Sequence, residues 1–182
     1  MPEGAGMTYR YEVTVERILS SPAHNYFTRP RFEPGDTASV DHLSVPLQSG
    51  RGIAGDRFEH SRYPITLFSR EVADLIEEAH GRSIDAALFR RNIVVSGINL
   101  SELVGVRFRL GGVLFEGVGH CAPCLWMDAA IGKGTYALMR GRGGLRAGVV
   151  EGGLLQRGTT LLACGKTLTM KPAASAPKRR LP

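Results

Sequence analysis

The side chains best suited to chemistry lie in one short segment, residues 119–128, with the sequence GHCAPCLWMD. This segment contains two of the three cysteines, Cys121 and Cys124, together with the only tryptophan and one of five histidines. A cysteine thiolate is a nucleophile, a soft metal ligand and a redox group. The pair could therefore bind a metal, carry sulfur, act as a redox dithiol, or pack in the core without a chemical role.

Spacing and context weaken two of these interpretations. A structural zinc site usually takes four ligands, and Cys164 has no partner nearby in the sequence. His120 directly precedes Cys121, which is an awkward spacing for two ligands of one ion. A thioredoxin-like dithiol would lie near a βαβ unit, whereas this segment follows a predicted β-hairpin late in the chain. A structural cysteine pair and a functional thiol at Cys121 or Cys124 both remain open.

The elements around this segment would place it at the end of a strand. Two alternating runs, 106–110 and 113–118, are joined by a Gly-Gly pair and predict a β-hairpin that leads to His120. Pro123 permits a helix that begins at Cys124 and continues through 125–131. A thiolate in that first helical turn would be stabilised by the helix N-terminus.

The remaining pattern predicts a mainly β fold, a barrel or sandwich with a few short peripheral helices, rather than a βαβ sheet. Val72, Leu75, Ile76 and Ala79 predict a helix over 70–80, with Ser69 as N-cap and Gly81 after its end. Ser83 is expected to cap a second short helix through Phe89, and 135–140 reads as a helical turn. Predicted strands cover 11–18, 40–47, 63–68, 93–97, 145–153 and 159–164.

Length and charge indicate one domain over 9–165, with a disordered start at 1–8 and a disordered basic tail at 166–182. The net charge of +6 comes mostly from five basic residues after position 164, without which 18 basic side chains face 17 acidic ones. A nearly neutral body without a basic, aromatic face argues against nucleic acid. No long apolar run or leader pattern is present, and an odd cysteine count favours reduced thiols, so we expect a cytoplasmic protein without a membrane segment.

Two other segments could bind a ligand. Three glycines within six residues, ending at Gly55 and followed by Asp56 and Arg57, would let the backbone approach a ligand closely. The spacing fits neither a Walker A loop nor a dinucleotide fingerprint, and a tight turn is the simpler interpretation. Arg90, Arg91 and Asn92 run directly into a β-branched strand. They could face an anion or form salt bridges at an exposed strand end. His24 is interpreted as an ordinary histidine of a surface loop. Cys164 is interpreted as a buried, unreactive cysteine.

From Gly52 to about Cys164 the sequence resembles the MOSC family, found at the C-terminus of molybdenum cofactor sulfurases and in small standalone bacterial proteins. The segments that match, in order, are GIAGDR at 52–57, ITLFS at 65–69, FRRNIVVSG at 89–97, LVGVRF at 103–108, the Cys-x-Pro-Cys segment at 121–124, and GLRAGVVEGG at 144–153. The resemblance implies a β-barrel that binds the molybdenum cofactor. It also implies that Cys124 is the thiolate ligand of the metal, while the role of Cys121 stays open.

Other residues enter by the same matching. Arg90, Arg91 and Asn92 would face the cofactor, with guanidinium groups suited to the pterin phosphate, and Gly55, Asp56, Arg57 and Arg146 are further candidates. The implied activity is a molybdenum-dependent oxidoreductase that reduces small N-hydroxylated or N-oxide substrates, with electrons from a separate reductase. The alternative is a sulfur carrier or binding module for sulfurated cofactor. The chain is too short to include a pyridoxal-phosphate sulfurase domain, so a cofactor sulfurase would be a separate partner, and homodimer formation is left open.

Overall fold

The computed structural model describes residues 6–25 and 35–169. Its strands are β1 (Tyr9–Ser20), β2 (Val40–His42), β3 (Ser44–Gln48), β4 (Gly52–Ile53), β5 (Ile65–Ser69), β6 (Ile93–Ser96), β7 (Arg107–Leu110), β8 (Val113–His120), β9 (Leu145–Glu151), β10 (Gly153–Gln156) and β11 (Gly158–Cys164). Its helices are α1 (Arg70–His80), α2 (Trp126–Ala130) and α3 (Thr135–Met139), with two 3₁₀ helices, η2 (Ala86–Phe89) and η3 (Leu100–Leu103).

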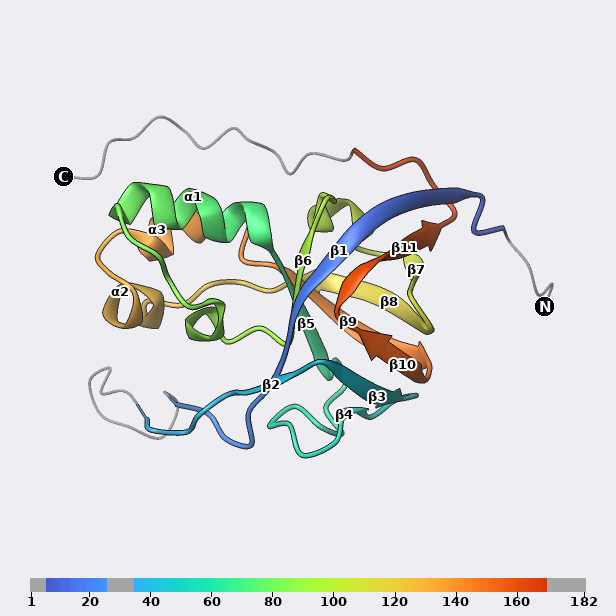
Figure 1. Ribbon diagram of the computed structural model, residues 1–182, viewed down its shortest axis with the longest axis horizontal. Coiled ribbons are helices and arrows are strands. Elements are labelled where there is room, and N and C mark those ends of the chain that lie inside the picture. Colours follow the sequence, from blue (N-terminus) through green and yellow to red (C-terminus); the bar gives the residue numbers. More distant parts are fainter. Residues whose placement is uncertain (1–5, 26–34, 170–182) are drawn as a thin grey trace.

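Seven strands close into a barrel in the order β11–β7–β8–β9–β5–β6–β1, and β1 pairs with β11 to complete the ring. The pairs are antiparallel except β5 with β6, which are parallel. β2 extends the sheet beside β1, and β10, β3 and β4 form a small second sheet. Helices α1, α2 and α3 gather on one side of the barrel (Figure 1). The prediction of a mainly β barrel with a few short peripheral helices is therefore confirmed.

β5 and β6 form the wall between two hydrophobic cores. Successive side chains of a strand point to opposite faces, so Ile65 and Leu67 fill the barrel while Phe68 packs among the helices. There it meets Phe89 of η2, with ring centroids 4.6 Å apart. All five residues of β5 are buried because both of its faces are covered. The three apolar side chains Ile65, Leu67 and Phe68 each contribute about 1.5–3 kcal/mol through burial.

The bounds of the elements agree with the sequence prediction where the capping and turn residues are distinctive. Helix α1 spans the predicted 70–80, the Val72 N–H donates to the Ser69 hydroxyl at 3.3 Å, and Gly81 ends the helix with φ of 63°. The second short helix is capped by Asp85 rather than Ser83 and is a 3₁₀ helix. The run 145–153 is divided between β9 and β10 at Gly152, where a side chain would lie 2.5 Å from the Leu47 carbonyl oxygen.

The chain after β11 packs back onto the barrel. Leu168 is buried in the barrel core, and its N–H donates to the Tyr11 hydroxyl at 2.7 Å. The Thr169 N–H and hydroxyl both donate to the Glu102 carboxylate. Residues 166–169 thus belong to the packed domain and not to the expected tail, because Leu168 has an apolar site to fill. The remainder of that tail, and residues 1–5, lie outside the described residues. Across the described ranges, no helix is long and apolar enough to cross a membrane.

This C-terminal contact is expected to weaken in acid. Hydrogen bonds from Thr169 lower the pKa of Glu102 below its ordinary value, against an opposing effect of burial. The hydrogen-bonded carboxylate therefore stabilises the fold at pH values above the pKa of Glu102 in the unfolded chain. This contribution is lost as the pH falls through the lower pKa of Glu102 in the folded protein. Urea unfolding of Glu102→Gln should show a smaller loss of stability on acidification than the wild type. Glu116→Gln, at an exposed carboxylate, is the control, and equal pH dependence of wild type and Glu102→Gln would contradict the expectation.

Candidate functional site

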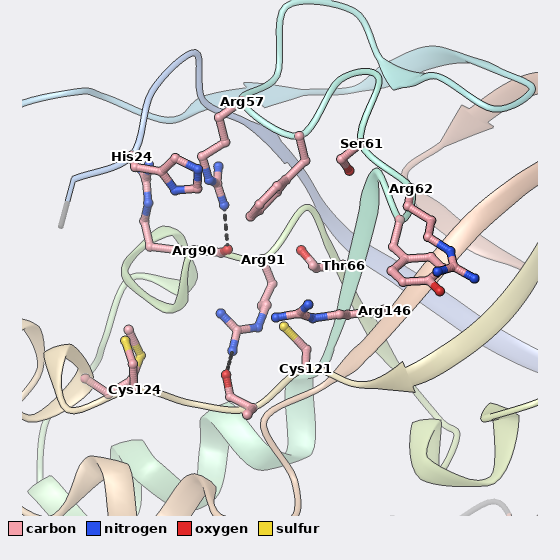
Figure 2. A pocket seen from close by; sticks show the side chains of 14 residues that line it. His24, Arg57, Ser61, Arg62, Thr66, Arg90, Arg91, Cys121, Cys124 and Arg146 are labelled. Atoms are coloured by element: carbon pink, nitrogen blue, oxygen red, sulfur yellow. Dashed lines mark hydrogen bonds between the residues drawn. The ribbon is translucent and has the colours of Figure 1, made fainter. Parts of the chain in front are cut away.

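One cavity of about 340 Å³ brings together segments that are distant in the sequence. These are the chain after β1, the loop after β4, the start of β5, the residues before β6, the chain after β8 and the start of β9. Its volume is typical of small-molecule sites. The cavity is lined by His24, Arg57, Phe58, Ser61, Arg62, Tyr63, Thr66, Arg90, Arg91, Cys121, Ala122, Cys124, Met127 and Arg146 (Figure 2). Five of these residues are arginines and none is acidic, an arrangement that favours an anionic ligand.

Arg91 is buried and bonded to neutral oxygens. Its guanidinium donates to the carbonyls of Gly143 at 3.0 Å, Phe89 at 2.8 Å and Ala122 at 3.3 Å. No ion pair joins it to a carboxylate within the described residues. A side chain at Gly143 would lie 2.4 Å from the Cys121 carbonyl oxygen, so a glycine is required for this close packing. Arg91 therefore fixes the chain around the cysteines and leaves its positive charge available to an anion.

Arg90 adopts an unusual backbone conformation for its residue type. Its φ of 59° makes it one of two non-glycine residues with positive φ in the described part of the chain, and its N–H closes η2 on the Ala87 carbonyl. Its buried guanidinium donates to the Ser21 hydroxyl at 3.0 Å, the Ala23 carbonyl at 2.7 Å and the Ser39 hydroxyl at 3.2 Å. Such strained positions persist where surrounding contacts impose them. Here the contacts join the cavity wall to the chain after β1.

Arg57 forms the neighbouring part of the wall. Its guanidinium donates to the Arg90 carbonyl at 2.9 Å and lies 4.6 Å from the Phe58 ring centroid. It also pairs with Asp56 at 3.5 Å, and both side chains are almost completely buried. Asp56 does not line the cavity. Its charge is therefore placed behind the wall, where it compensates only part of the positive charge in front of it.

Two exposed arginines and one buried hydroxyl complete the polar lining. The side chain of Arg146, in β9, forms no hydrogen bond or ion pair with the rest of the described chain. Arg62 lies 5.2 Å from the Tyr63 ring centroid. The Ser61 oxygen is buried and has no hydrogen-bond partner within the described ranges. Buried polar atoms are normally bonded, so the Ser61 hydroxyl and the Arg146 guanidinium both fit a polar ligand in the cavity.

Both cysteines of the central segment line this cavity, as free thiols. Cys124 is exposed, whereas Cys121 is buried. Figure 2 shows Cys121 on the side of Arg91 and Arg146, with Cys124 further along the wall. Cys164 is buried in the barrel core, as the sequence indicated. The arginines of the Gly55 and Arg91 regions therefore share one cavity with the Cys124 sulfur.

The expected helical setting of Cys124 is wrong. Helix α2 begins at Trp126, extends for five residues and has no side-chain cap. The Cys121 N–H donates to the Gly144 carbonyl at 2.8 Å, and Arg91 holds the Ala122 carbonyl, so the chain through Pro123 stays non-helical. The Cys124 carbonyl accepts from the Met127 N–H at 3.0 Å before the helix starts. Charge from arginines, and not a helix N-terminus, is therefore the electrostatic feature of this site.

Three of the sequence candidates support the cavity from behind instead of lining it. Asn92 is buried, accepts from the Thr66 N–H and hydroxyl, and donates to the Leu19 carbonyl and to Asp56. Asp56 also accepts from the N–H groups of Ser21 and Phe58. The Gly55 N–H donates to the carboxylate of Glu59, and its φ of 76° suits glycine. These contacts position the strands and loop that carry the arginines.

His24 belongs to the site although the sequence gave no signal for it. Its ring meets Phe58 edge to face, with centroids 5.2 Å apart, and it lines the cavity near Arg57 and Arg90. Burial lowers the pKa of His24, the positive charges of Arg57 and Arg90 lower it further, and Asp56 opposes them. The imidazole is therefore neutral at pH 7. Ser61, Arg62, Tyr63 and Met127 are further lining residues that sequence patterns did not identify.

These features define a class of protein: a small closed β-barrel whose loops gather arginines and a Cys-x-x-Cys pair at one cavity. A family model of the MOSC domain matches residues 50–166, and the chain belongs to this family. The MOSC family is generally associated with binding of the molybdenum cofactor. A comparison with curated proteins gives no match.

Solved structures share the fold. YuaD from Bacillus subtilis superposes with a TM-score of 0.67 at 16% identity, covering 87% of this chain and 99% of that one. YiiM from Geobacillus stearothermophilus gives 0.61 at 18% identity, covering 83% of this chain and 74% of that one. YiiM from Escherichia coli gives 0.57 at 18% identity, covering 89% and 73%. At these identities the similarity is one of fold alone.

Proposed function

We propose that this protein binds the molybdenum cofactor in the arginine-lined cavity, with Cys124 as the protein ligand of the metal. The observation that carries the proposal is an exposed thiol in the same cavity as five arginines and no carboxylate, in a MOSC chain. A soft thiolate suits a metal already held by dithiolene sulfurs. No group of three or more His, Cys, Asp or Glu among the described residues could hold a metal without such a cofactor.

The lining residues fit an anionic pterin. Arg91 and Arg146 have no carboxylate partner within the described chain and would contact its phosphate through paired N–H donors. Arg57 and Arg90 would add positive charge on the same wall. The unbonded Ser61 hydroxyl would provide a polar contact for the heterocycle. When bound, the cofactor would supply a metal that cycles between two oxidation states two electrons apart.

We further propose that the loaded protein reduces small N-hydroxylated or N-oxide substrates. Reduction of a hydroxylamine consumes two electrons and two protons and releases an amine and water, R–NH–OH + 2 e⁻ + 2 H⁺ → R–NH₂ + H₂O. The electrons would come from a separate reductase, and a cofactor sulfurase is a second expected partner. The cavity would admit a small substrate beside Cys124.

A second candidate function is a sulfur carrier. Cys121 and Cys124 line the same cavity, and the exposed Cys124 thiol could hold a persulfide beside the arginines. Turnover separates the two functions. Catalytic reduction of substrate with an artificial electron donor supports the oxidoreductase, whereas stoichiometric, cyanide-labile sulfur without turnover supports the carrier.

Cofactor retention tests the proposal directly. Wild-type protein purified from a host that makes the cofactor should contain about one molybdenum and one pterin per chain. Arg146→Met should lower both several-fold, because one unpaired guanidinium is lost, while its unfolding free energy stays within about 0.5 kcal/mol of wild type. Metal analysis, pterin fluorescence after extraction and urea unfolding provide the measurements.

Arg107→Met is the matched control for Arg146→Met, since Arg107 is an exposed arginine outside the cavity. It should retain wild-type molybdenum. Equal molybdenum content in all three proteins would contradict the proposal that this cavity holds the cofactor. A wild-type protein without molybdenum or pterin would refute cofactor binding itself.

A further inference from the structure

His24 is the one histidine among the residues that line the cavity. It comes from the chain after β1, and its ring is set against Phe58 at 5.2 Å between centroids. In Figure 2 the imidazole lies beside the Arg57 guanidinium, above the Arg90 backbone. Imidazole is the side chain whose ordinary pKa lies closest to neutrality. His24 is therefore placed to exchange a proton with a molecule bound in this cavity.

The charges that face His24 depend on what the cavity contains. Burial disfavours the imidazolium form, Arg57 and Arg90 disfavour it further, and among the described residues Asp56 favours it. The Asp56 carboxylate is also paired with Arg57 and accepts hydrogen bonds from Asn92, Ser21 and Phe58. These partners offset most of its negative charge. An anion beside Arg57 and Arg90 would offset their repulsion. Binding of an anion should thus favour protonation of the imidazole, by simple Coulombic linkage.

We propose that His24 is the proton site of this cavity: it takes up a proton when an anion binds beside Arg57 and Arg90, and donates that proton to the substrate oxygen that leaves as water. The uptake step requires only the cavity. The donation step rests on the proposed function, where cleavage of the N–O bond consumes two protons and two electrons from the external reductase. His24 would supply one of these protons and be reprotonated from solvent.

The uptake step can be measured on the protein without cofactor. Imidazole NMR signals would be followed from about pH 5 to about pH 8 with sodium sulfate, and with sodium chloride at equal ionic strength. Sulfate carries a constant charge over this range, so any linked proton belongs to the protein. The midpoint for His24 should lie below that of a free imidazole in chloride and rise by about one pH unit in sulfate, which corresponds to about tenfold tighter sulfate binding to the protonated form.

His42, His60 and His80 do not line the cavity and serve as internal references in the same spectra. A His24 midpoint that moves no further than theirs would overturn the uptake step. Arg57→Met should raise the His24 midpoint in chloride, because one of the two opposing charges is removed, and an unchanged or lower midpoint would also count against the proposal.

The donation step is tested in loaded protein with His24→Gln. Glutamine keeps a polar side chain but cannot supply a proton, so kcat should fall by about 100-fold or more, with molybdenum and pterin content unchanged. The wild-type kcat should decline as pH rises through the His24 midpoint, and this decline should be absent in the variant. Unchanged kcat would overturn the donation step.

These measurements distinguish failure of the His24 proposal from failure of the proposed function. If His24→Gln lost both its molybdenum and its activity, His24 would be a cofactor contact and the donation step would be overturned. Absence of molybdenum from wild type would refute both the proposed function and the donation step. The sulfate titration would still decide the uptake step, because it uses no metal.

Discussion

Replacement of Cys124 by serine is expected to lower the turnover of protein from a cofactor-producing host by at least about 100-fold. A serine hydroxyl stays protonated and offers a hard oxygen, which is a poor ligand for a sulfur-rich metal centre. Because Cys124 is exposed, the unfolding free energy should change by no more than about 0.5 kcal/mol. The measurements are reduction of a hydroxylamine with an artificial electron donor, expressed per chain and per molybdenum, and urea unfolding.

Cys121→Ser is the matched control, at a second thiol of the same cavity. Its turnover should stay within about tenfold of wild type, although burial of a hydroxyl at this position lowers stability by about 1–3 kcal/mol. Alkylation of the protein without cofactor gives an independent check, since the exposed Cys124 should react before Cys121 and Cys164. If Cys121→Ser abolished turnover and Cys124→Ser did not, the assignment of the metal ligand would be reversed.

The fold could be predicted where its signals are local. The Gly-Gly turn between β7 and β8, the N-cap at Ser69 and the apolar face of α1 are each encoded within a few residues. Closure of the barrel is not local, because β1 must pair with both β6 and β11. The closed barrel was therefore predicted from the resemblance to the MOSC family and not from local sequence patterns. The start of α2 was missed because the bonds that hold residues 121–123 out of a helix come from Arg91 and Gly144.

The site could be predicted by residue type more readily than by orientation. The segment 90–92 was expected to face the cofactor as a unit, yet Arg90 and Arg91 line the cavity while Asn92 points into the protein. Burial of Asn92 depends on partners in β1, in β5 and in the loop at Asp56, none of which is near in sequence. His24 was missed for the same reason, since only the folded chain brings it to Arg57 and Arg90.

This orientation leads to the second large effect, a loss of about 3–5 kcal/mol of stability in Asn92→Ala. The Asn92 amide is buried and joins β5, through the Thr66 N–H at 3.0 Å, to β1, through the Leu19 carbonyl at 3.2 Å. It also donates to Asp56 at 3.2 Å. Alanine would remove the bonds that Asn92 makes to the buried Thr66 N–H and Leu19 carbonyl, at about 1–3 kcal/mol for each group, and one of the bonds to Asp56, which keeps Ser21, Phe58 and Arg57 as partners. Urea unfolding of the protein without cofactor measures the loss.

Asn99→Ala is the control for the same substitution at a half-buried helix cap. The Asn99 side chain accepts from the N–H and hydroxyl of Ser101 at the start of η3, and its removal should cost about 1 kcal/mol. A stable Asn92→Ala protein that has lost its molybdenum would make Asn92 a direct cofactor contact. The opposite result, lost stability with molybdenum retained in the folded fraction, is expected, because the amide has used both its oxygen and its nitrogen on the protein and has no group left for a ligand.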